Sequence, residues 1–238
     1  GFLESLKIWD DFFFFFSKDF QVLAIDLPGF GKSDVFSEQH SMEFMAECVK
    51  AVLDENNIDK AVMAGHSMGG YVALSFAEKY GDRLAGNCLF HSHAAADNEE
   101  GRKNRDRILS IVEQGKKDFI NNFFPTLFSP DHVKKFEKEI AYLRELGRVT
   151  SAEGIKAALR GMRDRKSYFT LLSDIDQPVQ FVMGKKDEKI PYDKIIAQAT
   201  LCRYSHIVFL REAGHMGLIE EREMTLHALS SFAKKCFA

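Results

Sequence analysis

Short apolar runs alternate with longer helical patterns along most of this chain. The apolar runs have the length of strands and lie at residues 22–25, 61–64, 84–90, 179–183 and 207–210. Such runs are typical of strands that are buried on both faces of a parallel sheet. Helical spacing of apolar residues appears at residues 41–57, 71–80, 193–199 and 218–233. This alternation predicts an α/β fold, a mostly parallel sheet with helices on both faces.

A long charged stretch separates two of the predicted strands and shows only helical spacing. Pro125 and Pro130 interrupt it. Four glycines indicate further helix ends: Gly115, Gly147, Gly154 and Gly161. A connection of about 80 residues is too long for a simple crossover. We therefore expect a helical cap at 97–177, inserted after the strand that ends near Phe90, and a core formed by 1–96 and 178–238.

Composition excludes several classes of protein. The chain has 238 residues, 45% of them hydrophobic, and a net charge of −3. It is long enough to bury a proper core, and it lacks the basic excess of a general nucleic-acid binder. No apolar run reaches the roughly 18 residues of a membrane helix. Four scattered cysteines, without a C-x-x-C pair, predict buried thiols of a cytoplasmic protein rather than disulfides or a zinc site.

The motif Gly65-His66-Ser67-Met68-Gly69 lies directly between a predicted strand and a predicted helix. This is the context of a nucleophile elbow, in which the serine sits on a strained turn with its hydroxyl exposed. Side chains at Gly65 and Gly69 are expected to clash in such a turn. The start of the following helix favours a developing negative charge. A glycine-rich turn without chemistry is the alternative, but the agreement of strand, motif and helix favours a nucleophile.

A nucleophilic serine needs a base, and the base needs an acid to orient it. His215 lies just after the last predicted strand, and Asp187 just after the strand before it. The ends of parallel strands meet at one edge of the sheet, where ligands bind. The order Ser67, Asp187, His215 is that of a hydrolase triad. Glu188 is the nearest alternative acid.

His91 and His93 follow the strand at 84–90, where the predicted cap begins. We expect them to fix the hinge of the cap by hydrogen bonding. The alternative is that one of them lines a substrate pocket.

These motifs resemble the α/β-hydrolase superfamily, in its cap-bearing esterase and lactonase-like branch. Residues 26–33, Asp-Leu-Pro-Gly-Phe-Gly-Lys-Ser, look like the family's D-x-P-G-x-G-x-S loop. Residues 184–191 look like its acid loop, and residues 1–3 like the end of its H-G-x oxyanion segment. The resemblance implies an oxyanion hole made by the backbone N–H groups of Phe2 and Met68. Serine rather than aspartate at the elbow disfavours dehalogenase and epoxide hydrolase chemistry.

The resemblance also implies that the family's first three strands are missing from this chain. The third of them would lie between the strands at 22–25 and 61–64. Without it these strands would leave buried N–H and C=O groups unpaired, at about 1 to 3 kcal/mol each, so we expect about 20 to 25 further residues before Gly1.

Five consecutive phenylalanines, Phe12 to Phe16, fall where the family has its first helix. Five helical positions cover a full circle, so some of these rings are expected to face solvent. Such a run indicates either a sequence artefact or a patch for a partner or a membrane.

The sequence thus predicts a serine hydrolase that cleaves a small carboxylic ester or lactone without a cofactor or metal. The expected partner is the small-molecule substrate, with no nucleic acid and no stable membrane insertion. Candidate pocket residues are His91, His93, Phe124, Phe128 and Met216. The alternatives are C–C bond hydrolysis, perhydrolysis or acyl transfer by the same triad, or a weakly catalytic receptor-like binder.

Overall fold

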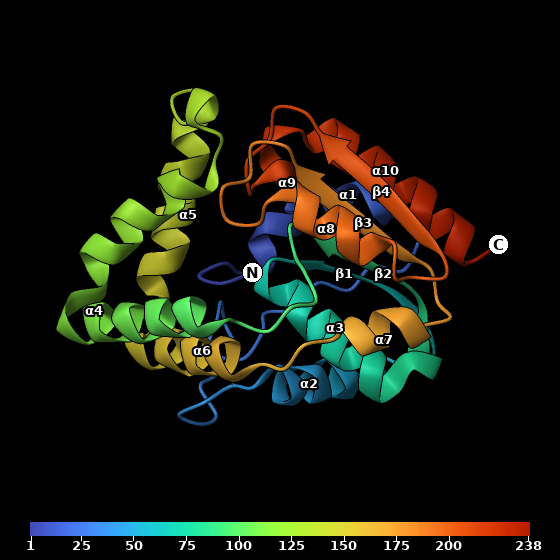
Figure 1. Ribbon diagram of the computed structural model, residues 1–238, viewed down its shortest axis with the longest axis horizontal. Helices are drawn as coiled ribbons and strands as arrows, with labels where there is room; N and C mark the ends of the chain where they lie inside the picture. The colour runs from blue at the N-terminus through green and yellow to red at the C-terminus, as the bar shows by residue number, and fades with distance from the viewer.

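The computed structural model describes residues 1–238 and contains one parallel sheet (Figure 1). Its four strands are ordered β1-β2-β3-β4, and every neighbouring pair is parallel. The strands are β1 (Ala61–His66), β2 (Leu84–Phe90), β3 (Val179–Gly184) and β4 (Ser205–Leu210). The predicted parallel α/β fold is confirmed, and four of the five predicted strands are present.

Helices cover both faces of the sheet (Figure 1). The strand β2 shows this directly: a side chain at Gly86 would touch Phe232 and Cys236, whereas Asn87 donates to the Ala73 carbonyl oxygen on the other face. Outside the predicted cap the helices are α1 (Asp10–Phe16), α2 (Met42–Glu55), α3 (Met68–Tyr80), α8 (Tyr192–Ala199), α9 (Gly217–Glu220) and α10 (Arg222–Cys236). The short helix α7 (Phe169–Asp174), within residues 97–177, contacts α8. In parallel sheets covered in this way, ligands bind at the carboxyl ends of the strands.

The expected strand at residues 22–25 is not formed. This segment runs without strand pairing, and Leu23 is 38% exposed. β1 pairs only with β2, so its other edge has no partner strand. A cavity of about 650 Å³ lies here, lined by both segments and by Phe16 and Phe20. An apolar segment forms a strand only where a neighbour completes its ladder, and residues 22–25 have none.

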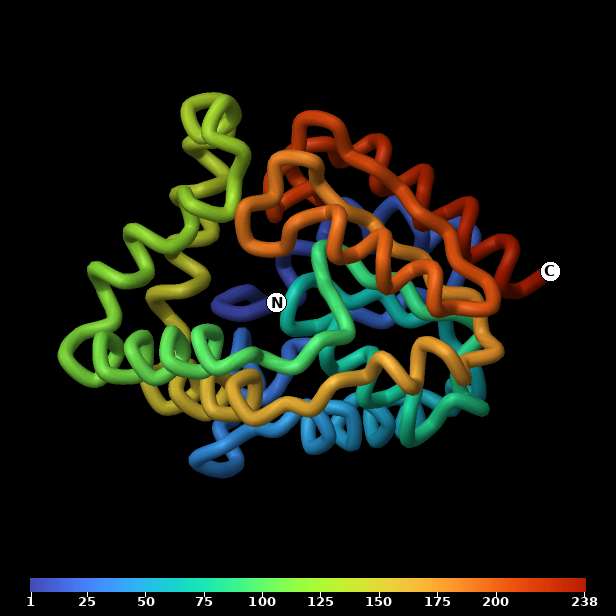
Figure 2. Tube along the Cα trace, viewed as in Figure 1, coloured from blue at the N-terminus to red at the C-terminus, as the bar shows by residue number.

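The stretch between β2 and β3 is helical and lies mainly to one side of the sheet (Figure 2). Its long helices are α4 (Glu99–Phe123), α5 (Glu137–Val149) and α6 (Ala152–Asp164). Of the four glycines expected at helix ends, Gly115 lies at one, because two helical segments meet there. Gly115 kinks α4, with φ 155°. The other three lie inside helices at close contacts: a side chain would meet Phe124 at Gly147, Gly29 at Gly154 and His40 at Gly161.

The loop at residues 26–34 ties the N-terminal segment to the core. Asp26 accepts hydrogen bonds from the amides of Leu6 (2.7 Å) and Lys32 (3.0 Å). Gly31 has φ 55°, and a side chain there would overlap the Asp26 carboxylate. Residues 1–5 therefore lie beside the end of β1, where a side chain at Gly1 would touch the His66 ring.

The phenylalanine run forms most of α1 and is divided between core and solvent. Phe12 and Phe16 are buried, whereas Phe14 is 69% exposed. The expectation that some rings face solvent is confirmed.

All four cysteines are free, and only Cys88 is fully buried. None of the helices has the length and apolar character needed to cross a membrane.

Candidate active site

Ser67 stands at the turn between β1 and α3, in a conformation unusual for serine. Its φ is 50° and its ψ is −115°. A non-glycine residue adopts positive φ at an energetic cost, and such strain collects at functional sites. The turn is held by two hydrogen bonds of 2.8 Å: the Ser67 amide donates to the Phe90 carbonyl oxygen, and the Ser92 hydroxyl donates to the Ser67 carbonyl oxygen.

The glycines of the elbow do not share one role. A side chain at Gly65 would lie 2.3 Å from the Gly69 carbonyl oxygen, and one at Gly70 would lie 2.3 Å from the Ser92 hydroxyl. A side chain at Gly69 would meet nothing within 4 Å. The expected clash therefore exists at Gly65 but not at Gly69, and Gly70 is the second position that tolerates no side chain.

His215 and Asp187 are joined by a short hydrogen bond. The Nδ1 atom of His215 lies 2.8 Å from Oδ2 of Asp187, and both side chains are buried. Because a carboxylate only accepts, Nδ1 carries the proton and Nε2 is left as the basic nitrogen. The Ser67 hydroxyl has no hydrogen bond to His215 in this structure, and such bonds often tighten only when substrate binds.

Asp187 is held from two sides. Its Oδ1 atom accepts from the amides of Lys189 (2.8 Å) and Ile190 (3.0 Å), while Oδ2 also accepts from Nδ1 of His91 at 3.0 Å. Burial alone would raise the pKa of Asp187, but the neighbouring imidazoles, His215 first, hold it well below its usual range. Asp187 is therefore ionised at neutral pH.

The loop that carries His215 is fixed by Glu220 of α9. The Oε1 atom of Glu220 accepts from the amides on either side of His215, those of Gly214 (2.9 Å) and Met216 (3.2 Å). The His215 amide itself donates to the Leu127 carbonyl oxygen at 2.7 Å. Residues from the helical stretch and from α9 thus hold the same loop.

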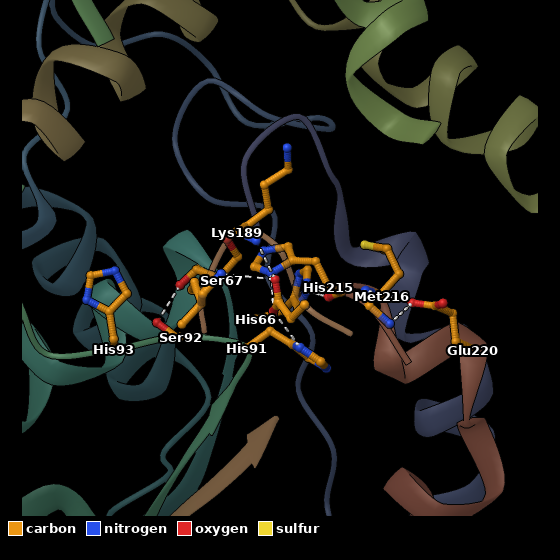
Figure 3. Close-up of polar contacts among 12 residues, drawn as sticks. His66, Ser67, His91, Ser92, His93, Lys189, His215, Met216 and Glu220 are labelled. Atoms are coloured by element: carbon orange, nitrogen blue, oxygen red, sulfur yellow. Dashed lines mark hydrogen bonds and ion pairs between the residues drawn. The ribbon is translucent and has the colours of Figure 1, made fainter. Parts of the chain in front are cut away.

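His66, next to Ser67 in the chain, has both ring nitrogens bonded to other groups. Its Nδ1 atom lies 2.9 Å from Oε2 of Glu4, and its Nε2 atom 2.9 Å from the His215 carbonyl oxygen. Figure 3 shows Ser67, His66, His91 and His215 gathered together, with His93 on the far side of Ser92. His66 therefore links the N-terminal segment to the loop of His215.

Two amides are candidates for binding an oxyanion. Met68 begins α3, so its N–H has no acceptor within the helix. The Phe2 N–H donates to no carbonyl oxygen, and the Phe2 ring packs against Phe30 and Phe123 with centroids 6.1 and 5.9 Å apart.

The candidate pocket residues have different surroundings. His91, Phe124, Phe128 and Met216 are buried. His93 is half-buried, its Nε2 atom 3.2 Å from the Tyr71 hydroxyl, and burial lowers its pKa to about 3. Neither the cavity beside β1 nor one of about 800 Å³ between α5 and α10 is lined by Ser67, Asp187 or His215.

His91, Asp187 and His215 also place three donor atoms within 4.8 Å of one another, as a metal site would. The Nδ1 atoms of His91 and His215 both already donate to Oδ2 of Asp187. Those bonds account for the cluster without an ion.

Sequence reasoning missed three residues of this site: Glu4, Ser92 and Glu220. Glu4 and Glu220 carry a readable signal, because a carboxylate within an apolar pattern is seldom buried unless it is paired. Glu220 follows Leu218 and Ile219 in the apolar start of the last helical segment.

Comparisons with known proteins agree with this geometry. A family model described as alpha/beta hydrolase fold matches residues 1–222. The structure of a thermophilic esterase from Thermogutta terrifontis superimposes with a TM-score of 0.95 at 30% identity, covering 100% of this chain and 88% of that one.

Two curated relatives are named for different activities, one as a lactonase and one as an acetyltransferase component. The 3-oxoadipate enol-lactonase 1 of Acinetobacter baylyi is 26% identical over 221 residues, 90% of this chain and 79% of its own length. The dihydrolipoyllysine-residue acetyltransferase component of the acetoin cleaving system of Pseudomonas putida is 28% identical over 223 residues. This chain spans 56% of that relative's length. With the parallel sheet, the serine elbow and the family match together, the chain belongs to the α/β-hydrolase family, as the sequence motifs predicted.

Proposed function

We propose that this chain is a serine hydrolase that cleaves a small carboxylic ester or lactone through an acyl-enzyme intermediate. One observation carries the proposal: Ser67, in a strained conformation at the start of α3, lies beside a buried His215 that is hydrogen-bonded to Asp187. The esterase and enol-lactonase relatives support this substrate class.

In this mechanism Nε2 of His215 takes the Ser67 proton as the hydroxyl oxygen attacks the substrate carbonyl carbon. Asp187 holds the imidazole in the required tautomer and stabilises the imidazolium. The N–H groups of Met68 and Phe2 stabilise the tetrahedral oxyanion, and each such donor contributes about 3 to 4 kcal/mol in the transition state. His215 then protonates the leaving alcohol and activates the water that releases the acid.

The helices α4 to α6 are proposed to form the cap over this site. Their link to the site is the segment at residues 127–129: the Leu127 carbonyl oxygen binds the His215 amide, and a side chain at Gly214 would touch the Ser129 backbone. Phe123, which packs against Phe2, brings an apolar ring from α4 to the oxyanion segment.

The test is a panel of esters and lactones of increasing acyl length, run on wild-type protein and on Ser67→Ala. We expect hydrolysis by wild type and only background by the variant. A fluorophosphonate probe should label wild type and not Ser67→Ala. Full activity of Ser67→Ala on p-nitrophenyl acetate, with contaminating esterase removed, would contradict the proposal.

A further inference from the structure

His91 is a buried histidine that the proposed mechanism does not use. It follows β2 directly, and its φ is 45°, in the left-handed region that non-glycine residues adopt at an energetic cost. Its amide donates to the Val182 carbonyl oxygen at 2.8 Å. The backbone is thus held in place at this position, and the side chain points toward Asp187.

His91 and His215 donate to the same oxygen atom. Oδ2 of Asp187 lies 3.0 Å from Nδ1 of His91 and 2.8 Å from Nδ1 of His215. Since the ionised carboxylate only accepts, both Nδ1 atoms carry protons. Nε2 of His91 is buried and has no hydrogen-bond partner. Burial lowers the pKa of His91, which keeps that nitrogen unprotonated.

Other titratable groups surround this pair. From the end of β1, the His66 ring lies 6.0 Å from that of His91 and 5.2 Å from that of His215, and it pairs with Glu4 of the N-terminal segment. From α9, Glu220 binds the amides beside His215. None of these groups donates to Oδ2 of Asp187, so His91 is the one competitor of His215 there.

Gly217 leaves the space that the His91 ring occupies. A side chain at Gly217, the first residue of α9, would lie 2.3 Å from Nε2 of His91. Glycine at this position leaves room for the imidazole and for nothing larger.

We propose that His91 is a positioning residue that tunes the basicity of His215 by donating a second hydrogen bond to the Asp187 oxygen that His215 uses. This inference rests on the proposed function, in which His215 is the general base. Each donor stabilises the charge of a carboxylate. The bond from His91 therefore leaves less of that charge to stabilise the His215 imidazolium.

The first test compares the pH dependence of kcat/KM in wild type, His91→Leu and His91→Asn. Leucine removes the donor, whereas the asparagine amide can donate from the position of Nδ1. We expect the acid limb of His91→Leu to move up by about half to one pH unit, and His91→Asn to return it toward wild type. His206→Leu is the control, because His206 lies in β4 against Phe232 and has no bond to Asp187, and its acid limb should not move.

A residue that only fills space would lower stability or kcat without moving the acid limb. An unshifted acid limb in a folded His91→Leu protein would overturn the proposal.

A second measurement needs no turnover and no variant of His91. Nitrogen-15 NMR of the imidazoles in wild type and in Ser67→Ala reports the tautomer of each histidine. We expect His91 to keep Nδ1–H and a bare Nε2 across the range in which His215 titrates. A protonated Nε2 on His91 would overturn the proposal even if no substrate were known. Activity surviving in Ser67→Ala would instead contradict the proposed function alone.

Discussion

Glu220 and His132 are hydrogen-bonded between the core and the helical stretch, with Oε2 of Glu220 2.9 Å from Nδ1 of His132. The same oxygen accepts from the Ser129 amide at 2.9 Å, while Oε1 accepts from the two amides beside His215. One buried carboxylate thus joins the helical stretch between β2 and β3 to the loop of His215. Its removal should affect both at once.

We predict that Glu220→Gln lowers the free energy of unfolding by about 2 to 4 kcal/mol, because the amide group turns a donor toward buried N–H groups. It should also lower kcat, since the loop of His215 loses its support. Urea denaturation and ester hydrolysis measure the two effects. Glu223→Gln, at an exposed position of α10, is the control, with a change within about 0.5 kcal/mol. Equal stability of the two variants would show that the four bonds contribute nothing.

Glu4 should make stability depend on pH in acid. Burial alone would raise its pKa, but the hydrogen bond and charge of the His66 imidazole lower it below its usual 4.5. A carboxyl with a depressed pKa stabilises the fold above its unfolded pKa and loses that contribution as pH falls. The expected loss is about 1 to 3 kcal/mol as pH falls below roughly 4.5.

Urea denaturation at several pH values checks this expectation. Glu4→Gln should be less stable than wild type near neutrality and should lose less stability across the acid range. If the two curves run parallel from neutral pH to about pH 2, Glu4 is not the linked group.

The elbow glycines provide a matched pair of substitutions. Gly65→Ala places a methyl group 2.3 Å from the Gly69 carbonyl oxygen, so the backbone must shift, at a cost of about 2 to 3 kcal/mol. Gly69→Ala meets nothing within 4 Å and lies in α3, where alanine is favoured by about 1 kcal/mol over glycine. Thermal unfolding of both proteins checks the contrast, and equal melting temperatures would refute it.

The parts of the fold that could be predicted are those determined by the local sequence pattern. Residues 84–90 form a strand with the expected bounds. Their apolar pattern predicts a strand, and strands on both sides, β1 and β3, complete its hydrogen bonds. The run at residues 22–25 has the same local pattern and forms no strand, because pairing is decided by which chain lies beside it. The elbow could be predicted because its five residues are consecutive, so the requirements of the turn appear directly in the sequence.

The supporting contacts of the site could not be read in this way. His91 lies 96 residues from Asp187, and Glu220 lies 88 residues from His132. These pairs come together only in the folded protein, and no sequence motif contains both residues of either pair. The helix-interior glycines were misjudged for a related reason. Gly154 and Gly161 permit contact with loops more than 100 residues away, and this contact leaves no local signature.

Asp187 rather than Glu188 should be the acid of the triad. Asp187 is buried and bonded to His215, whereas Glu188, next to it in the chain, is exposed. In Asp187→Asn the amide group would face two Nδ1–H donors, so the imidazole would lose its required tautomer. We predict a fall in kcat of about 10⁴-fold with a small change in KM, and slower labelling of Ser67 by a fluorophosphonate. Glu188→Gln should keep wild-type kcat. The reverse pattern, with kcat lost in Glu188→Gln and kept in Asp187→Asn, would move the acid to Glu188 and remove the basis for a role of His91.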